Sequence, residues 1–190
     1  MIKAENLLLE TRKLSKKKTC NHFNDYFVNI GPTLAKGIPC VEDKDCSTFL
    51  ENSVTNSIYL NPVTPNEILD IVKHFKNKYS SGYDDLNMVT VKKSISCILQ
   101  PLTYICNLSM ETGLFPDNMK TAKVIPLFKA GDRKLISNFR PISILPQFSK
   151  ILEKIIYNRL TLFIKHENII YDGQYGFREN HSTTQALMQL

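Results

Sequence analysis

The 190-residue sequence has no apolar run that approaches the ~18 residues of a membrane-spanning helix. Its opening stretch, MIKAENLLLETRKLSKKK, has an apolar centre of only Leu7 to Leu9, which is too short for a signal peptide. The sequence therefore predicts an intracellular protein, cytoplasmic and/or nuclear, with no membrane partner. The basic cluster that ends this stretch could be a nuclear address, although a solvated run of charge is the more common explanation.

The sequence also lacks a recognisable metal site. Its five cysteines include no CxxC pair, and the spacing of Cys20, His22, Cys40 and Cys46 fits no zinc-finger pattern. Free thiols in a reducing compartment fit this number and spacing better. The four histidines are scattered and form no nucleophile–base pattern, which argues against a hydrolytic enzyme.

What the sequence does contain is enough apolar material for a core and an excess of positive charge. Hydrophobic residues make up 43% and charged residues 22%, as in soluble globular proteins. Lys plus Arg total 24 against 18 Asp plus Glu, giving a net charge of +6. This excess favours a polyanionic partner, and nucleic acid more than a membrane surface.

Residues 1–60 are predicted to be an N-terminal arm or linker that is partly poorly ordered. Apolar residues recur at helical spacing from Phe23 to Leu34, but Gly31 and Pro32 predict an interruption there. The stretch from Cys40 to Asn61 is polar and rich in Ser, Thr and Asn, which predicts a loop.

Residues 61–190 form the second predicted unit, in which helical signals are stronger. Thr64, Pro65 and Glu67 have the spacing of a capping box that begins a helix. A second helix is expected over about 90–112, with Pro101 dividing or kinking it and Gly113 ending it. A third is indicated by apolar residues every three or four positions from Phe148 to Phe163. A last helix, capped by Ser182 or Thr183, is still in progress at Leu190, which suggests truncation.

Between the second and third helices, a β-hairpin is predicted. Val124 to Phe128 and Phe139 to Leu145 are extended runs, and Ala130-Gly131-Asp132 is a turn. Pro126 and Pro141 indicate strands that lie at an edge or pair incompletely. The hairpin carries five cations: Lys123, Lys129, Arg133, Lys134 and Arg140. A lysine and an arginine here could bind a triphosphate, or the lysines and prolines could simply protect an exposed edge from aggregation.

The stretch QYGFRENHSTTQAL combines Gly176, Phe177 and Arg178 with the start of a helix. Backbone N–H groups at a helix start suit phosphate binding, and an exposed aromatic can stack on a base. An ordinary loop with a buried Phe and a capping Ser explains the same residues.

Together, these segments resemble the reverse transcriptases of non-LTR retrotransposons, the LINE-type elements of the jockey and chicken-repeat kind. The resemblance rests on FPDNMKTAKVIPLFKAGDRKLISNFRPISILPQFSKILEKIIYNRL and QYGFRENHSTTQAL, supported by SSGYDDLNMVTVKK, PLTYICNLSMETGLFP and FNDYFVNIG upstream. It covers about residues 20–190. It implies an α+β fold, mainly helical with a β-hairpin, that forms the fingers and first edge of the palm of a right-handed polymerase, truncated before the catalytic palm.

The resemblance also implies roles for individual residues. Lys129 and Arg140 are expected to bind the triphosphate of an incoming dNTP. Template positioning is expected of Gln174, Gly176, Phe177 and Arg178. The implied partners are an RNA template and a DNA primer, and the full-length enzymes of the family use Mg²⁺.

The family's metal-binding aspartates lie on palm motifs that follow HSTTQAL, and this sequence ends before them. Two-metal phosphoryl transfer needs those carboxylates, so the fragment is expected to bind no metal and to be inactive alone. The pair Asp84-Asp85 matches instead a family Ser-Gly-x-Asp loop, in which Asp84 caps the backbone and Asp85 stands where Gly is common. The alternatives are a non-catalytic, possibly domesticated nucleic-acid-binding remnant and the product of a decayed element without function.

Overall fold

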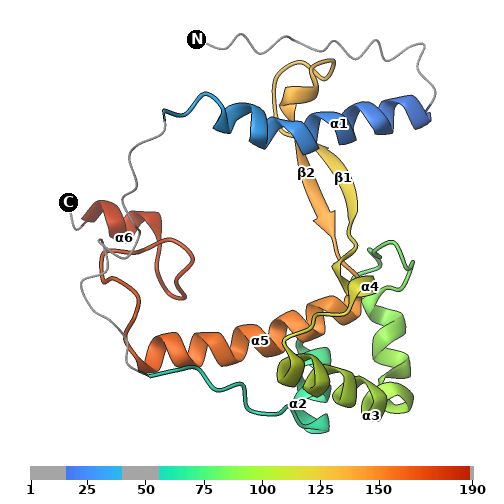
Figure 1. The fold of residues 1–190 in the computed structure, drawn as a ribbon, viewed down its shortest axis with the longest axis vertical. Coiled ribbons are helices and arrows are strands. Elements are labelled where there is room, and N and C mark those ends of the chain that lie inside the picture. Colours follow the sequence, from blue (N-terminus) through green and yellow to red (C-terminus); the bar gives the residue numbers. More distant parts are fainter. Residues whose placement is uncertain (1–15, 40–55, 189–190) are drawn as a thin grey trace.

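A computed structural model describes residues 16–39 and 56–188, and the sequence expectations for residues 1–15 and 40–55 fall outside this range. The described residues form six α-helices, one short 3-10 helix and one two-stranded antiparallel sheet (Figure 1). In chain order these are α1 (Lys16–Ala35), α2 (Pro65–His74), α3 (Met88–Thr112), α4 (Asp117–Lys120), β1 (Lys123–Phe128), η2 (Ile136–Asn138), β2 (Phe139–Ile144), α5 (Gln147–His166) and α6 (Thr183–Met188).

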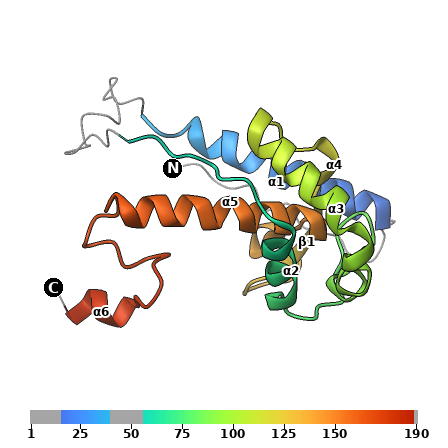
Figure 2. The ribbon, with the colours of Figure 1, turned by 90° about the horizontal axis from the view of Figure 1, so that it is seen from below.

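The main core lies where α2, α3 and α5 meet, and Figure 2 shows these three helices side by side. Each contributes the apolar stripe that its sequence predicts: Ile68 and Val72 from α2, Val91 and Cys106 from α3, and Ile151 and Ile155 from α5 are almost fully buried. Apolar side chains recurring every three or four residues face one direction on a helix, so burying the stripes brings the three helices together. Pro101 does not divide α3, because the helix is continuous from Met88 to Thr112. A kink there, the other expected outcome, stays a prediction.

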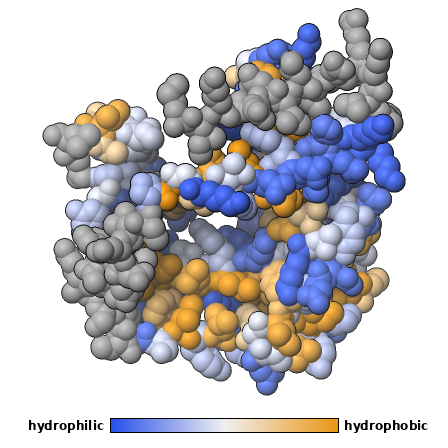
Figure 3. Space-filling view, turned by 45° about the horizontal axis from the view of Figure 1, so that its top comes forward, coloured by the Kyte–Doolittle hydropathy of each residue, from blue (hydrophilic) through white to orange (hydrophobic). Residues whose placement is uncertain are grey.

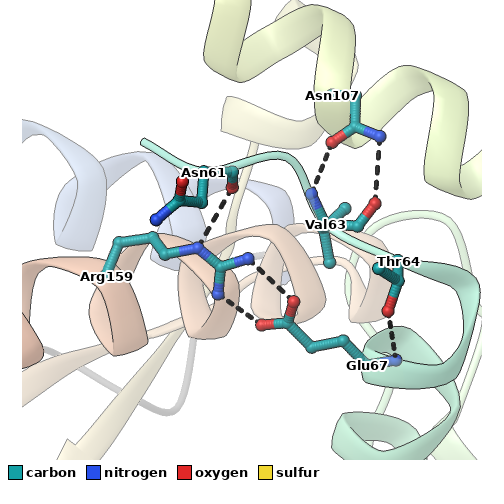
Figure 4. Close-up of polar contacts among 6 residues, drawn as sticks. All are labelled: Asn61, Val63, Thr64, Glu67, Asn107 and Arg159. Carbon is teal, nitrogen blue, oxygen red and sulfur yellow. Dashed lines mark hydrogen bonds and ion pairs between the residues drawn. The ribbon is translucent and has the colours of Figure 1, made fainter. Parts of the chain in front are cut away.

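An extended segment before α2 crosses this core and is held by side chains from two helices (Figure 4). The backbone of Val63 pairs with the side-chain amide of Asn107 on α3: the Val63 N–H donates to Oδ1 over 2.7 Å, and Asn107 Nδ2 donates to the Val63 carbonyl over 3.0 Å. Arg159 on α5 donates Nε to the Asn61 carbonyl over 3.2 Å. Arg159 also makes two hydrogen bonds to the Glu67 carboxylate, the one from Nη2 being 2.7 Å.

The expected capping box at the start of α2 is only half formed. The Glu67 N–H donates to Thr64 Oγ1 over 3.3 Å, as expected, but the Glu67 side chain binds Arg159 instead of returning to the Thr64 backbone. Both side chains of this ion pair are largely shielded, with exposures of 12% for Arg159 and 26% for Glu67. A bidentate contact with a rigid guanidinium, away from bulk water, is stronger than a local bond to one exposed N–H.

A second, smaller core joins α1 to the hairpin. Phe23 and Ile136 are its buried residues, and the Phe23 ring meets the Phe139 ring edge-on with centroids 5.0 Å apart. Figure 1 shows α1 lying across the end of the hairpin that is farther from α5. The predicted interruption at Gly31-Pro32 is wrong, because α1 continues to Ala35. Pro32 lies in the last turn, where its missing N–H removes one internal hydrogen bond of the helix.

In the loop that contains Tyr83-Asp84-Asp85, the side chains of the first two residues form hydrogen bonds to the backbone. Asp84 Oδ1 accepts a hydrogen bond from the Leu86 N–H over 3.2 Å, which is the backbone cap expected from the sequence. The Tyr83 hydroxyl donates to the Asn118 carbonyl over 2.8 Å. Asp85 has φ +55°, the left-handed region in which Gly is favoured. A glycine would adopt this backbone conformation at a lower cost than the Asp85 that stands here.

Figure 3 shows how polarity is distributed over one face of the molecule. In the upper part of that view hydrophilic side chains gather toward the right, and apolar side chains gather over the lower half. Exposed apolar residues of the helices include Tyr104 and Leu108 on α3 and Tyr157, Leu160 and Leu162 on α5. Among the described helices, none has the length and apolar character needed to cross a bilayer.

Candidate nucleotide and nucleic-acid interface

The hairpin predicted from the sequence is present, and its register is regular. β1 and β2 pair from Lys123 opposite Ile144 to Phe128 opposite Phe139. Just beyond the last pair, the Lys129 N–H donates to the Asn138 carbonyl over 2.8 Å. Hydrogen-bonded and non-hydrogen-bonded pairs alternate along an antiparallel ladder. Pro126 and Pro141 are opposite each other and fall on a non-hydrogen-bonded pair, where the missing N–H costs the ladder nothing.

The register places Lys129 and Arg140 on one face of the hairpin. Arg140 is opposite Leu127, and Lys129 follows Leu127 by two residues, so all three side chains project to the same side. Phe128 and Phe139 project to the other side, where the Phe139 ring packs on Phe23 of α1. The structure thus separates the two faces: α1 covers the aromatic face, and the face with the two cations stays open.

Lys129 and Arg140 are both exposed, and neither makes an ion pair with a described residue. Three apolar side chains share their face of the hairpin and remain half exposed: Ile125 at 43%, Leu127 at 56% and Ile142 at 42%. This face therefore combines two free cations at one end with an apolar strip along the strands, an arrangement suited to a ligand that has both charged and apolar parts.

The tip that joins the strands is held by its own hydrogen bonds. The side chain of Asp132 accepts from the Lys134 N–H over 2.9 Å, and Asn138 Nδ2 donates to the Asp132 carbonyl over 2.9 Å. Gly131 has φ +89°, and a Cβ there would come within 2.8 Å of Asn138 Nδ2. Arg133 stacks over the Phe128 ring, with the guanidinium carbon 4.4 Å from its centre. The sequence predicted the turn but gave no sign that Asn138 closes it.

The four residues expected to position a template lie in the loop between α5 and α6, and they do not behave alike. Phe177 is fully exposed and has φ +60°, an uncommon conformation for a bulky residue. The expectation of the ordinary-loop alternative, a buried Phe, is therefore wrong. Gly176 has open space around it, and Gln174 Nε2 donates to the Gly176 carbonyl over 3.2 Å.

Arg178 is directed back toward the loop itself. Its Nη1 lies 3.4 Å from the Tyr171 carbonyl and 3.5 Å from the Asp172 carbonyl, both long hydrogen bonds. Ser182 caps α6, because Ser182 Oγ accepts from the Gln185 N–H and Gln185 Oε1 accepts from the Ser182 N–H. Arg178 thus braces the loop, while Phe177 is presented to solvent.

The hairpin and the 174–178 loop are not brought together. Figure 1 shows them at opposite ends of α5, with the hairpin rising from one end and the loop following the other. Within the described residues, no group of three or more His, Cys, Asp or Glu side chains is placed to hold a metal ion. Two of the four residues whose spacing was compared with zinc fingers, Cys40 and Cys46, lie outside the described residues.

Comparisons with known proteins indicate the family of the chain. No family model matches the sequence. It is 31% identical over 142 residues to the "Probable RNA-directed DNA polymerase from transposon BS" of Drosophila melanogaster, a match that covers 74% of this chain and 16% of that protein. It is 32% identical over 140 residues to the "RNA-directed DNA polymerase from mobile element jockey" of the same species, covering 73% of this chain and 15% of that protein. The jockey polymerase of Drosophila funebris is 34% identical over 127 residues, or 66% of this chain and 14% of that protein.

The chain belongs to the family of non-LTR retrotransposon RNA-directed DNA polymerases. The resemblance drawn from the motifs is confirmed. These three matches extend over 127 to 142 residues of the chain. The chain spans 14 to 16% of the length of these polymerases, so it corresponds to one segment of them.

Proposed function

We propose that the chain is the part of a non-LTR retrotransposon reverse transcriptase that binds the incoming nucleotide's triphosphate through the β1–β2 hairpin. The observation that carries this proposal is the shared, open face of Lys129 and Arg140, both exposed and without an acidic partner among the described residues. The ammonium supplies a point charge and the guanidinium a two-pronged donor that matches phosphate oxygens. The alternative, in which the lysines and prolines only protect an exposed edge from aggregation, does not require both cations to lie on the face opposite α1.

We further propose that the loop with Gln174, Gly176, Phe177 and Arg178 positions the RNA template, with a DNA primer completing the substrate. The exposed Phe177 offers a ring on which a base can stack. Its left-handed backbone is a costly conformation for a bulky residue, and such outliers cluster at functional sites. Arg178 supports this role indirectly, because its hydrogen bonds to the 171 and 172 carbonyls hold the loop in shape.

The proposed fold is the fingers and first palm edge of a right-handed polymerase, and the proposed cofactor of the full-length enzyme is Mg²⁺. The family resemblance supports both, since its metal-binding aspartates lie on motifs beyond HSTTQAL. We propose that these 190 residues alone do not extend a primer, because two-metal transfer requires carboxylates that those motifs supply. An intracellular location fits the cysteines that the structure describes, Cys20, Cys97 and Cys106, all of which are free thiols.

Nuclear magnetic resonance on the ¹⁵N-labelled chain tests the triphosphate site without requiring catalysis. Titration with dATP is expected to shift the amide signals around Lys129 and Arg140, and deoxyadenosine, which lacks phosphates, is expected not to. Lys129→Ala or Arg140→Ala should each weaken dATP binding about tenfold, the effect of losing one charge-assisted contact of about 1.5 kcal/mol. Lys36→Ala, on an exposed lysine outside the hairpin, is the matched control. Equal dATP binding by all variants would rule out the proposed site.

Primer extension on an RNA template addresses the second claim. The chain with Mg²⁺ and dNTPs is expected to incorporate no nucleotide. Mg²⁺-dependent incorporation by the purified chain would show that it holds its own catalytic centre.

A further inference from the structure

A hollow of about 300 Å³ lies between the end of α2 and the first turn of α5, on elements that the hairpin and the 174–178 loop do not share. Figure 2 shows α2 beside the part of α5 nearest β1. Three of the lining residues are lysines, namely Lys76, Lys78 and Lys150, and no Asp or Glu lines the hollow. Its volume is at the lower end of the range found for ligand sites.

Two of these lysines come from one extended segment that follows α2. Lys76, Lys78 and Ser80 line the hollow, whereas the residues between them, Asn77 and Tyr79, do not. Successive side chains of an extended chain project to opposite sides, so every second residue faces the same way. The sequence pattern Lys-x-Lys-x-Ser therefore places both ammonium-bearing side chains toward one space.

The frame around the hollow is fixed by buried contacts. Gln147 at the start of α5 is only 3% exposed, and its Nε2 donates to the Ser80 carbonyl over 3.1 Å. Lys150 Nζ donates to Gln147 Oε1 over 3.4 Å. Gly82 packs so closely on the residues just before α5 that a Cβ there would come within 2.9 Å of the Pro146 nitrogen. The lysine-bearing segment is thus held against α5.

No described acidic side chain forms an ion pair with the three lysines that line the hollow. Lys76 and Lys78 make no ion pair with a described residue, and the one described partner of Lys150 is the neutral Gln147. Burial, followed by repulsion from Lys78, lowers the pKa of Lys150, while Glu153 and Asp84 act in the opposite direction. Lys150 is half-buried, whereas Lys76 and Lys78 are exposed. An anion near Lys78 and Lys150, which repel each other, would favour their charged forms.

We propose that this hollow is a phosphate-binding site, formed by Lys76, Lys78 and Lys150, that takes either a phosphate of a nucleic-acid strand or free phosphate. It is additional to the hairpin and to the 174–178 loop. It does not depend on the polymerase assignment, because the argument uses only the lining charges and the frame that holds them.

The test uses the whole ¹⁵N-labelled chain and two probes, inorganic phosphate and a fluorescein-labelled single-stranded RNA. Phosphate, compared with chloride at equal ionic strength, is expected to shift the amide signals of residues 76–80 and 147–150. These shifts should be lost in Lys78→Gln/Lys150→Gln. The control variant Lys36→Gln/Lys154→Gln removes the same charge from two lysines that do not line the hollow and should keep the shifts. If the double variant unfolds, Lys78→Gln alone, which changes one exposed side chain, is compared with wild type in its place.

The RNA arm identifies the source of the phosphate. The dependence of log affinity on log salt has a slope of about −0.7 for each phosphate contact on a single strand. Loss of two contacts in Lys78→Gln/Lys150→Gln should therefore reduce the slope by about 1.4, with the slope of the control variant unchanged. A reduced slope assigns the site to a nucleic-acid strand, and phosphate-induced shifts with an unchanged slope assign it to free phosphate. Absence of phosphate-induced shifts at both segments, or equal shifts in the double variant, would overturn the proposal.

Discussion

The contact between Asn107 and Val63 gives the sharpest stability prediction. The Asn107 side chain makes the two hydrogen bonds to Val63 that a neighbouring β-strand would make. Its amide oxygen accepts from the Val63 N–H over 2.7 Å, and its amide nitrogen donates to the Val63 carbonyl over 3.0 Å. Val63 is 3% exposed, so water cannot fully take over either bond. Asn107→Ala removes both, at ~1 kcal/mol of net stability each, and adds part of the cost of a buried unpaired group, ~1–3 kcal/mol. We expect a loss of about 2–3 kcal/mol in the free energy of unfolding.

A second substitution separates the two bonds. Asn107→Asp keeps an oxygen for the Val63 N–H but, when ionised, sets another oxygen against the Val63 carbonyl. Protonation converts that oxygen into a donor and restores the pair. We therefore expect Asn107→Asp to be less stable than wild type at pH 7 and to recover part of the difference near pH 4.

Urea unfolding followed by circular dichroism measures these differences through the midpoint at constant m-value. Asn66→Ala, at an exposed position of α2, is the control and should change the free energy of unfolding by less than about 0.5 kcal/mol. A loss below about 0.5 kcal/mol for Asn107→Ala, or a pH-independent deficit for Asn107→Asp, would refute the reasoning.

Three further predictions follow from backbone geometry and burial. Gly82→Ala should lower the melting temperature, because its Cβ would lie 2.9 Å from backbone of Pro146, whereas Gly31→Ala should raise it, since Gly31 is helical with open space around it. Asp85→Gly should be more stable than Asp85→Ala by about 1 kcal/mol in urea unfolding, because φ is +55° at this residue; equal stabilities would contradict this. Burial raises the pKa of the Cys106 thiol to about 11, above about 8.5 for an exposed thiol. Folding therefore favours the neutral thiol. The stability that this thiol contributes is complete below the pKa of the exposed thiol and is lost as pH rises toward the pKa of the buried one. Cys106→Ala should therefore show a smaller fall in stability between pH 8 and pH 11 than wild type.

The elements with strong local patterns could be predicted from the sequence. The stripes of α2, α3 and α5, the Ser182 cap and both strands of the hairpin are found at or near their expected positions. Each depends on periodicity or on residues within four positions of one another. The prediction failed at Gly31-Pro32, which lies inside a continuous helix. At Pro101 the helix is not divided, and the kink expected as the other outcome stays a prediction. Packing of an apolar face can outweigh the single hydrogen bond that a proline removes.

Contacts between distant residues could not be predicted. Arg159 and Glu67 are 92 positions apart, and Asn107 and Val63 are 44 apart. Neither contact can be recognised from the neighbouring sequence. Other basic side chains on α5 and another amide side chain on α3 look equally suitable as partners. Lys129 and Arg140 could be named as site residues, but their common face required the register of the hairpin. The inward direction of Arg178 and the exposure of Phe177 also depend on the folded loop.

The register of the hairpin determines which face is open, and the two prolines restrict that register. Because side chains alternate, a slip of one residue in either strand would turn its cations toward α1 and its aromatic ring toward solvent. Such a slip would also move Pro126 or Pro141 from a non-hydrogen-bonded to a hydrogen-bonded position, where the ladder needs the N–H that proline lacks. The aromatic contact of Phe139 with Phe23 opposes the same slip, since it requires Phe139 to face α1. The prolines that the sequence presented as signs of a weak edge thus help to keep Lys129 and Arg140 together on the face that α1 leaves open.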